Sequence, residues 1–183
     1  GCLALTALRP SGRQGRVRRR FLSAVTPEGL SFCTETAAAV CGRVYVLEDS
    51  YGLAPALLQR VLEQALQLGQ TCLVCYTPLQ PDGAPAHLLV PGAGAAFVAS
   101  SPDFPYAGER CCTLELDGTL PPAARDTLHF ARDTAGTLLR KAAEHVREAK
   151  RIHDELEALC RPYVDFAAAD ALTERTLHEL FPA

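Results

Sequence analysis

The chain has 183 residues, of which 48% are hydrophobic, and a formal net charge of -3. This length can bury one full core but hardly two independent ones. The charge gives no overall nucleic-acid signature, and no apolar run approaches the length of a membrane span. The eight cysteines, several of them inside apolar segments, fit a reducing compartment better than a disulfide scaffold, so we expect a cytoplasmic protein.

The first twenty residues combine a short apolar run, Cys2–Leu8, with five arginines between Arg13 and Arg20. We interpret residues 1–20 as an edge strand followed by a basic linker, and the apolar run is too short for a signal peptide. A basic arm that binds nucleic acid or an acidic partner is the alternative. Nucleic acid is the less favoured partner, because no aromatic residues are interleaved with the arginines.

A βαβ unit is predicted between Arg43 and Tyr76, after a turn at Thr26–Gly29 and a helix. Its first strand is the short apolar run Val44–Leu47, which is typical of a strand covered on both faces. The helix that follows has apolar side chains at three- and four-residue steps. Gly69 suits the left-handed conformation that ends a helix, and a second buried strand follows it.

The turn between that strand and its helix, residues 48–56, is the candidate binding site. In a doubly wound fold, backbone N–H groups and the positive end of the helix dipole converge there and attract a phosphate. The candidate residues of such a vestigial phosphate loop are Ser50, Tyr51, Gly52, Leu53 and Ala54. An ordinary βα turn that never bound phosphate is the alternative.

The turn lacks the chemistry of an active P-loop. The motif G-x-x-x-x-G-K-[ST] supplies a lysine for the β/γ-phosphates and a hydroxyl for magnesium. Here Asp49 and Ala54 stand at the outer glycines of the motif, and Pro55 and Ala56 stand at its lysine and hydroxyl positions. Glu48 and Asp49 also place negative charge where a phosphate would lie.

Three further strands and one candidate metal ligand follow. His87–Val90 and Ala95–Ser100 are apolar segments separated by a Gly/Pro turn, and Cys111–Gly118 predicts a strand that ends in a turn. Asp103 is the only candidate for a magnesium-binding acid after the strand at Ala95–Ser100. An aspartate that follows a proline in a loop is more often a turn residue, and we favour that interpretation.

The last third of the chain is helical in pattern. From Ala123 to Cys160, apolar residues recur at three- and four-residue steps, which predicts one long helix or a pair broken near Gly136. A final helix is expected near Ala167–Leu180, and a turn at Arg161-Pro162 would make a helical hairpin. An exposed apolar stripe on the long helix would bind a partner helix or a second copy of the chain.

The remaining polar and thiol groups give no site by spacing. Cys72 and Cys75 lie three apart in a strand and so face opposite sides, and no second pair has ligand spacing. On one stretch of helix, His153, Asp154 and Glu157 could form a carboxylate-histidine site, although exposed surface residues are the favoured interpretation. We predict no catalytic residue and no metal site.

Three phrases occur in a fixed order along the chain: FLSAVTPEG at Phe21–Gly29, the strand Val44–Leu47 with the loop after it, and AKRIHDELE at Ala149–Glu157, which Asp165-Phe166 follows. Together they resemble a family of poorly characterised bacterial P-loop ATPase-like proteins. Some members of that family carry two P-loop halves in tandem, and this chain resembles one half. The resemblance covers about Arg20 to the C-terminus.

The resemblance implies an α/β fold, a P-loop NTPase-like three-layer sandwich with a mainly parallel sheet, to which a C-terminal long helix or helical hairpin is added. It also implies ATP with magnesium as the family's ligand. Only Gly52 matches the family's phosphate loop, so ATP binding does not carry over onto Pro55 and Ala56.

We therefore expect one degenerate domain over residues 21–183, with an α/β core at 21–120 and a helical part at 121–183. Its expected function is that of a structural or protein-interaction module that does not hydrolyse nucleotide. The alternative is an ATP-binding protein or ATPase with a non-standard phosphate loop, in which Arg43 or Arg60 replaces the lysine.

Overall fold

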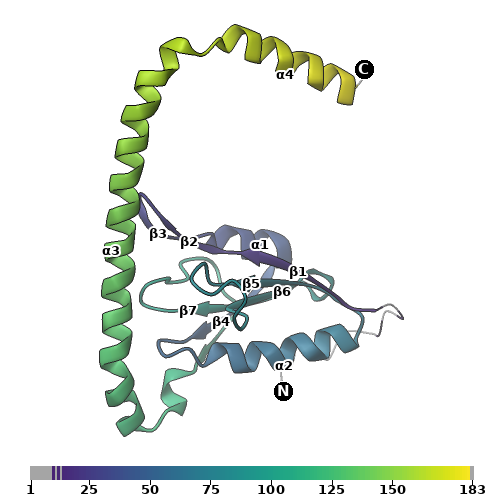
Figure 1. Cartoon of the computed structure of the whole chain (residues 1–183). Coiled ribbons are helices and arrows are strands. Elements are labelled where there is room, and N and C mark those ends of the chain that lie inside the picture. Colours follow the sequence, from purple (N-terminus) through teal and green to yellow (C-terminus); the bar gives the residue numbers. More distant parts are fainter. Residues whose placement is uncertain (1–9, 11, 13, 182–183) are drawn as a thin grey trace. The chain divides into compact units, whose positions relative to one another are not determined.

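The computed structural model describes residues 10, 12 and 14–181, and its centre is a six-stranded mixed sheet (Figure 1). The strand order is β1-β5-β6-β7-β4-β8. The strands are β1 (Arg16–Phe21), β4 (Arg43–Glu48), β5 (Thr71–Tyr76), β6 (His87–Val90), β7 (Ala95–Ser100) and β8 (Cys112–Glu115).

The expectation of a mainly parallel sheet is wrong, because β6 runs antiparallel to both of its neighbours, β5 and β7. The pairs β1–β5, β4–β7 and β4–β8 are parallel. Short connections explain the direction of β6. Only the 3₁₀ turn η1 (Pro91–Ala93) and Gly94 separate β6 from β7, and a parallel crossover needs a dozen or more residues.

The predicted strands and helix of the βαβ unit are present, with α2 at Ala54–Gln67. Pro55 lies in the first turn of α2. Gly69 has a left-handed φ of 73° after the end of the helix, as the sequence predicted. The two strands of the unit are not neighbours, however, since β6 and β7 lie between β5 and β4.

Helices cover both faces of the sheet (Figure 1). On one face, α2 buries Leu58, Val61 and Leu62 against the strands. On the other face, the buried side chains of α1 (Thr34–Cys41) pack in a second hydrophobic cluster with residues of the strands. Cys72 and Cys75 are buried in the two different clusters, as their spacing predicted, and burial raises the pKa of their thiols to about 11 and about 12.

Two N-terminal features differ from the sequence-based interpretation. The predicted basic linker contributes β1, an edge strand, so regular structure begins before residue 21. The turn at Thr26–Gly29 is present, but it joins β2 (Ser23–Thr26) to β3 (Gly29–Phe32) in a small antiparallel sheet that the sequence analysis missed. The predicted strand at Cys2–Leu8 lies outside the described residues.

The long C-terminal helix α3 spans Pro122–Cys160 and continues through Gly136. The short 3₁₀ turns η2 (Asp117–Thr119) and η3 (Arg161–Tyr163) flank it, and α4 spans Phe166–Leu180. Among the described helices, none combines the length and apolarity that crossing a bilayer requires.

The chain divides into two compact units, Gly1–Val146 and Arg147–Ala183. Every residue from 147 to 181 is exposed, so within the second unit α4 and the end of α3 do not bury one another. The expected packed helical hairpin is therefore wrong, whereas the alternative of one long helix is confirmed.

Candidate functional site

The turn after β4 is filled by the side chain of Asp49. Asp49 is buried at the end of β4, where its backbone N–H donates to the carbonyl of Ser100 on β7 at 2.8 Å. Its carboxylate accepts hydrogen bonds from the backbone N–H groups of Leu53 at 2.8 Å, Ala54 at 2.7 Å and Tyr51 at 3.3 Å. These N–H groups open helix α2, where helices have unpaired donors that attract anions.

A second carboxylate pairs with the same turn. The backbone N–H of Ser50 donates to Oδ1 of Asp117, in η2, at 2.8 Å. Gly52, at the tip, takes the left-handed φ of 77°. Of the five predicted loop residues, Ser50, Tyr51, Leu53 and Ala54 therefore direct their amides to carboxylates of the chain itself, in the place where phosphate oxygens would bind.

The turn borders a small crevice at the carboxyl ends of the strands. The turn after β4 and the loop after the parallel strand β7 both lie at the carboxyl ends of their strands, which is the edge where open α/β sheets bind ligands. The cavity there measures about 150 Å³ and is lined by Asp49, Gly52, Pro55, Thr77 and His87, among others. Ligand sites for drug-sized molecules measure about 300–1,000 Å³, so this cavity is smaller than such a site.

His87 is a buried histidine in this crevice that the sequence analysis did not select. Its Nδ1 accepts the backbone N–H of Ala99 at 3.1 Å, and its ring stacks on Phe32 with centroids 5.0 Å apart. Burial lowers its pKa from 6.5 to about 4, so the ring is neutral at pH 7 with its proton on Nε2. A histidine opening an otherwise apolar strand was the only signal in the sequence.

Neither arginine that was considered as a replacement for the P-loop lysine lies at the turn. Arg43 begins β4, five residues and roughly 17 Å of strand from the turn, and its guanidinium donates to the carbonyl of Ala93 at 2.6 Å. Arg60 is exposed on α2, roughly 9 Å along the helix axis from Ala54. The structure thus shows no cationic side chain among the residues that line the crevice.

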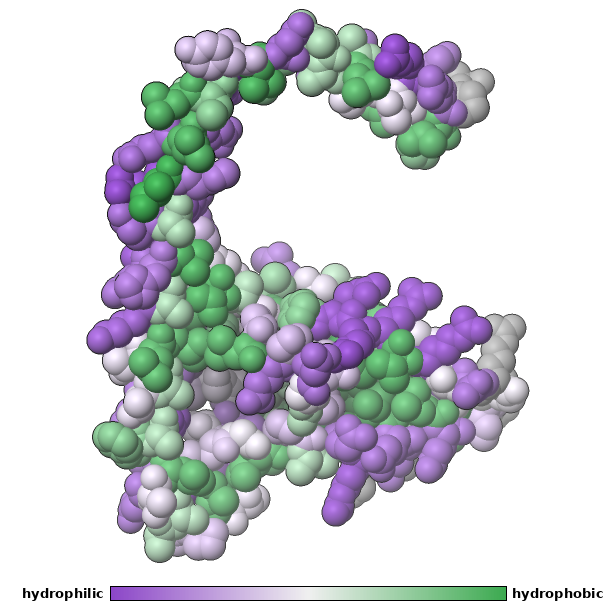
Figure 2. Space-filling view, viewed as in Figure 1, coloured by the Kyte–Doolittle hydropathy of each residue, from purple (hydrophilic) through white to green (hydrophobic). Residues whose placement is uncertain are grey.

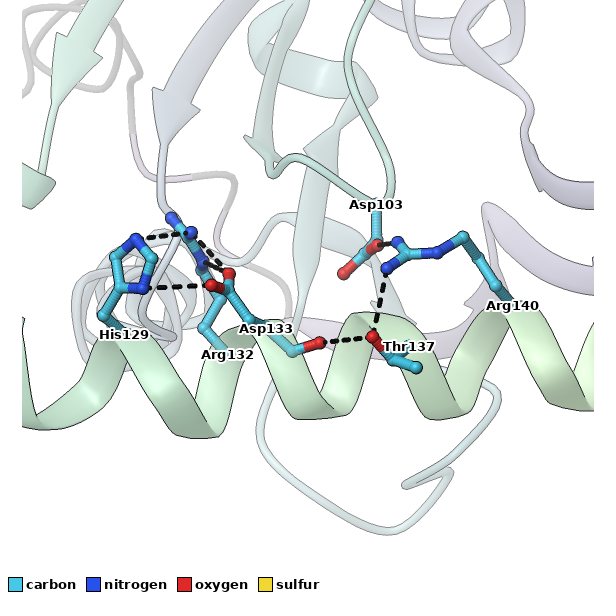
Figure 3. Close-up of polar contacts among 6 residues, drawn as sticks. All are labelled: Asp103, His129, Arg132, Asp133, Thr137 and Arg140. Carbon is cyan, nitrogen blue, oxygen red and sulfur yellow. Dashed lines mark hydrogen bonds and ion pairs between the residues drawn. The ribbon is translucent and has the colours of Figure 1, made fainter.

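Asp103, the candidate magnesium ligand, contacts α3 instead (Figure 3). Its Oδ1 accepts a hydrogen bond from Nη1 of Arg140 at 3.1 Å, and Arg140 also donates to Oγ1 of Thr137 at 3.3 Å. A Cβ at Gly136 would lie 2.8 Å from that carboxylate, so the helix approaches the loop closely at this glycine. Among the described residues, no cluster of three or more His, Cys, Asp or Glu side chains could hold a metal ion.

A second polar group on α3 lies one turn earlier (Figure 3). Arg132 donates to Asp133 at 2.6 Å and lowers the pKa of that carboxyl, and Nδ1 of His129 is 3.0 Å from Asp133. Nε2 of His129 lies 3.1 Å from Nη2 of Arg132. The guanidinium of Arg132 lies 5.8 Å from the ring of Tyr51, which connects α3 to the turn after β4.

The other candidate polar residues are on exposed helix surface. In α3, His153, Asp154 and Glu157 are exposed, and Asp154 is paired with Lys150. This agrees with the interpretation that we favoured, in which the three are exposed surface residues.

Comparisons with protein-family models, with curated proteins and with solved structures find no match to this chain. The resemblance of its three phrases to a P-loop ATPase-like family therefore stays a prediction.

Proposed function

We propose that this chain is a degenerate P-loop-like domain that does not hydrolyse nucleotide and that serves as a structural or protein-interaction module. The observation that carries the proposal concerns the carboxylate of Asp49. It accepts the backbone N–H hydrogen bonds of Tyr51, Leu53 and Ala54. The turn keeps the backbone geometry of an anion site, and the anion is part of the chain.

Displacement of Asp49 by a phosphate is unfavourable for two reasons. Asp49 is 7% exposed, so a phosphate that took its hydrogen bonds would leave a buried carboxylate without partners. The phosphate would also approach the negative charges of Asp49 and Asp117, which repel it. The helix dipole and the turn amides are therefore used for the stability of the fold.

The interaction role is supported by the second unit. Ile152, Leu156 and Leu159 recur at steps of four and three on α3 and are 53%, 57% and 71% exposed. Such an apolar stripe on a charged helix is the surface that a partner helix or a second copy covers.

Titration calorimetry of the chain with ATP and with ADP, each with and without magnesium, tests the proposal. We expect no binding at millimolar nucleotide. In urea unfolding, Asp49→Asn should lower the free energy of unfolding by roughly 1–3 kcal/mol, because the turn loses its charged acceptor. The matched control Asp82→Asn, at an exposed loop carboxylate, should change it by less than about 0.5 kcal/mol.

Two results would overturn the proposal. Micromolar nucleotide binding, or magnesium-dependent ATP hydrolysis abolished by Gly52→Asp, would support the alternative of an ATPase with a non-standard loop. Equal unfolding free energies for Asp49→Asn and the wild type would show that the carboxylate does not hold the turn.

A further inference from the structure

A groove lies along the edge of the sheet, at the end of the strands opposite to the crevice after β4. Its volume is about 870 Å³, and residues that line it include Arg16, Arg18, Gln70, Thr71, Leu73 and Gly92. Ligand-binding clefts measure about 300–1,000 Å³, so this groove has the size of a binding site whereas the crevice does not.

Strand register places Arg16 and Arg18 of β1 on the groove side. Arg16 pairs with Thr71 and Arg18 pairs with Leu73, and paired residues of neighbouring strands point to the same face of a sheet. Two residues of strand separate these arginines by roughly 7 Å. Arg20 continues the row at the same spacing, and Figure 2 shows hydrophilic side chains gathered where β1 runs in Figure 1.

The positive charge of the groove is not compensated by the described part of the chain. No acidic residue lines the groove, and no described carboxylate forms an ion pair with Arg16 or Arg18. Arg19, on the opposite face of β1, is instead paired with Asp82 at 2.9 Å. Cations that line a concave surface focus a positive potential into it, which attracts an anionic partner.

We propose that this groove binds an extended acidic peptide segment of a partner protein. An extended peptide repeats every two residues at roughly 7 Å, which is the spacing of Arg16 and Arg18. Carboxylates at alternate positions of the peptide then meet successive guanidinium groups, each of which can donate two parallel hydrogen bonds. The half-buried side chain of Leu73, which is in register with Arg18, supplies an apolar contact beside the charged positions.

Two observations favour this occupant and this position over others. Nη1 of Arg20 donates to the backbone carbonyl of Arg19 at 2.7 Å, which partly blocks the open edge of β1, so the peptide lies in the groove and not as an added strand. A single-stranded nucleic acid needs aromatic platforms for its bases, and none of the residues that line the groove is aromatic.

Fluorescence anisotropy with the full chain at low salt tests the proposal. The probe is a labelled peptide of alternating glutamate and serine, and a peptide of the same composition with its glutamates in one block tests the spacing. The variant Arg16→Gln/Arg18→Gln removes the two groove charges. The control Arg60→Gln/Arg175→Gln removes the same net charge at exposed helix positions.

We expect the alternating peptide to bind the wild type and to bind the groove variant roughly tenfold more weakly, since two exposed charge pairs are lost. The control should bind within about twofold of the wild type, and the block peptide should bind more weakly than the alternating one. The proposal fails if both double variants weaken binding equally or if the alternating peptide does not bind. It also fails if labelled oligothymidylate binds more tightly than the peptide and loses affinity in the groove variant.

Discussion

At the scale of single residues, Asp49 shows how far the sequence could predict the site. Its position in the turn and its unfavourable charge for a phosphate were readable from the chain. The direction of its carboxylate was not, because it depends on the left-handed Gly52 and on the start of α2 at Ala54, which turn the following amides back towards Asp49. His87 was missed for a similar reason, since its burial depends on a sheet neighbour and on Phe32.

The lowered pKa of His87 predicts a specific pH dependence of stability. Between pH 6.5 and about 4, the unfolded chain binds a proton that the folded chain does not bind. The free energy of unfolding therefore falls as the pH drops through this range, by roughly 3 kcal/mol in total from this group. Urea unfolding at pH 7 and at pH 4.5 should show that His87→Gln loses less stability on acidification than the wild type.

An exposed histidine of α3, His153, provides the control for that measurement. His153→Gln should keep the pH dependence of the wild type, because His153 is exposed in the folded chain. Identical pH dependence in the wild type and in His87→Gln would contradict a buried neutral ring at position 87.

At the scale of elements, apolar patterns predicted the central strands and helix α2, where burial on two faces leaves a clear signal. They failed at β1, whose side chains are exposed and mostly arginine, as on many protected edge strands. The direction of β6 depends on connection length and was not predicted from the residues of the strand, His87–Val90. The sequence could have predicted an antiparallel pair there, because Pro91–Gly94 is too short for a crossover.

The contact between α3 and the Asp103 loop predicts coupling between two positions. An added Cβ at Gly136 would meet the Asp103 carboxylate at 2.8 Å, whereas alanine in a helix is favoured over glycine by about 1 kcal/mol. Gly136→Ala should therefore stabilise the Asp103→Ala variant by about 0.5–1 kcal/mol and should stabilise the wild type less or destabilise it.

A double-mutant cycle in urea measures this coupling. Its four chains are the wild type, each single variant and the double variant. Additive changes would show that α3 does not lie against the Asp103 carboxylate.

At the scale of the whole molecule, the two units distribute their apolar residues differently. The first unit has two clusters of buried apolar side chains, one on either face of the sheet, although other large apolar residues such as Leu79 and Phe130 are exposed. The second unit leaves all of its described residues exposed, so its helices have no core of their own. Helical propensity and ion pairs such as Arg151 with Glu148 contribute little stability by comparison with a packed face.

The exposed stripe of α3 predicts self-association. We expect sedimentation to show a concentration-dependent oligomer that Leu156→Glu weakens by at least roughly tenfold, because a charge replaces an apolar contact in the helix pair. The control Ala158→Glu adds the same charge on another side of the helix and should leave the oligomer intact. A monomer at all concentrations would exclude a second copy and leave a helix of another protein as the occupant of the stripe.

The two buried thiols of β5 make the opening of the sheet measurable. With pKa values raised to about 11 and about 12, neither Cys72 nor Cys75 supplies a thiolate at neutral pH while the sheet is closed. Alkylation of these two thiols therefore requires a rare local unfolding of the sheet. The exposed Cys33 and Cys160 react without such unfolding. The rate of the slow phase of labelling thus measures how often the core opens to solvent, and no reporter group has to be added to the chain.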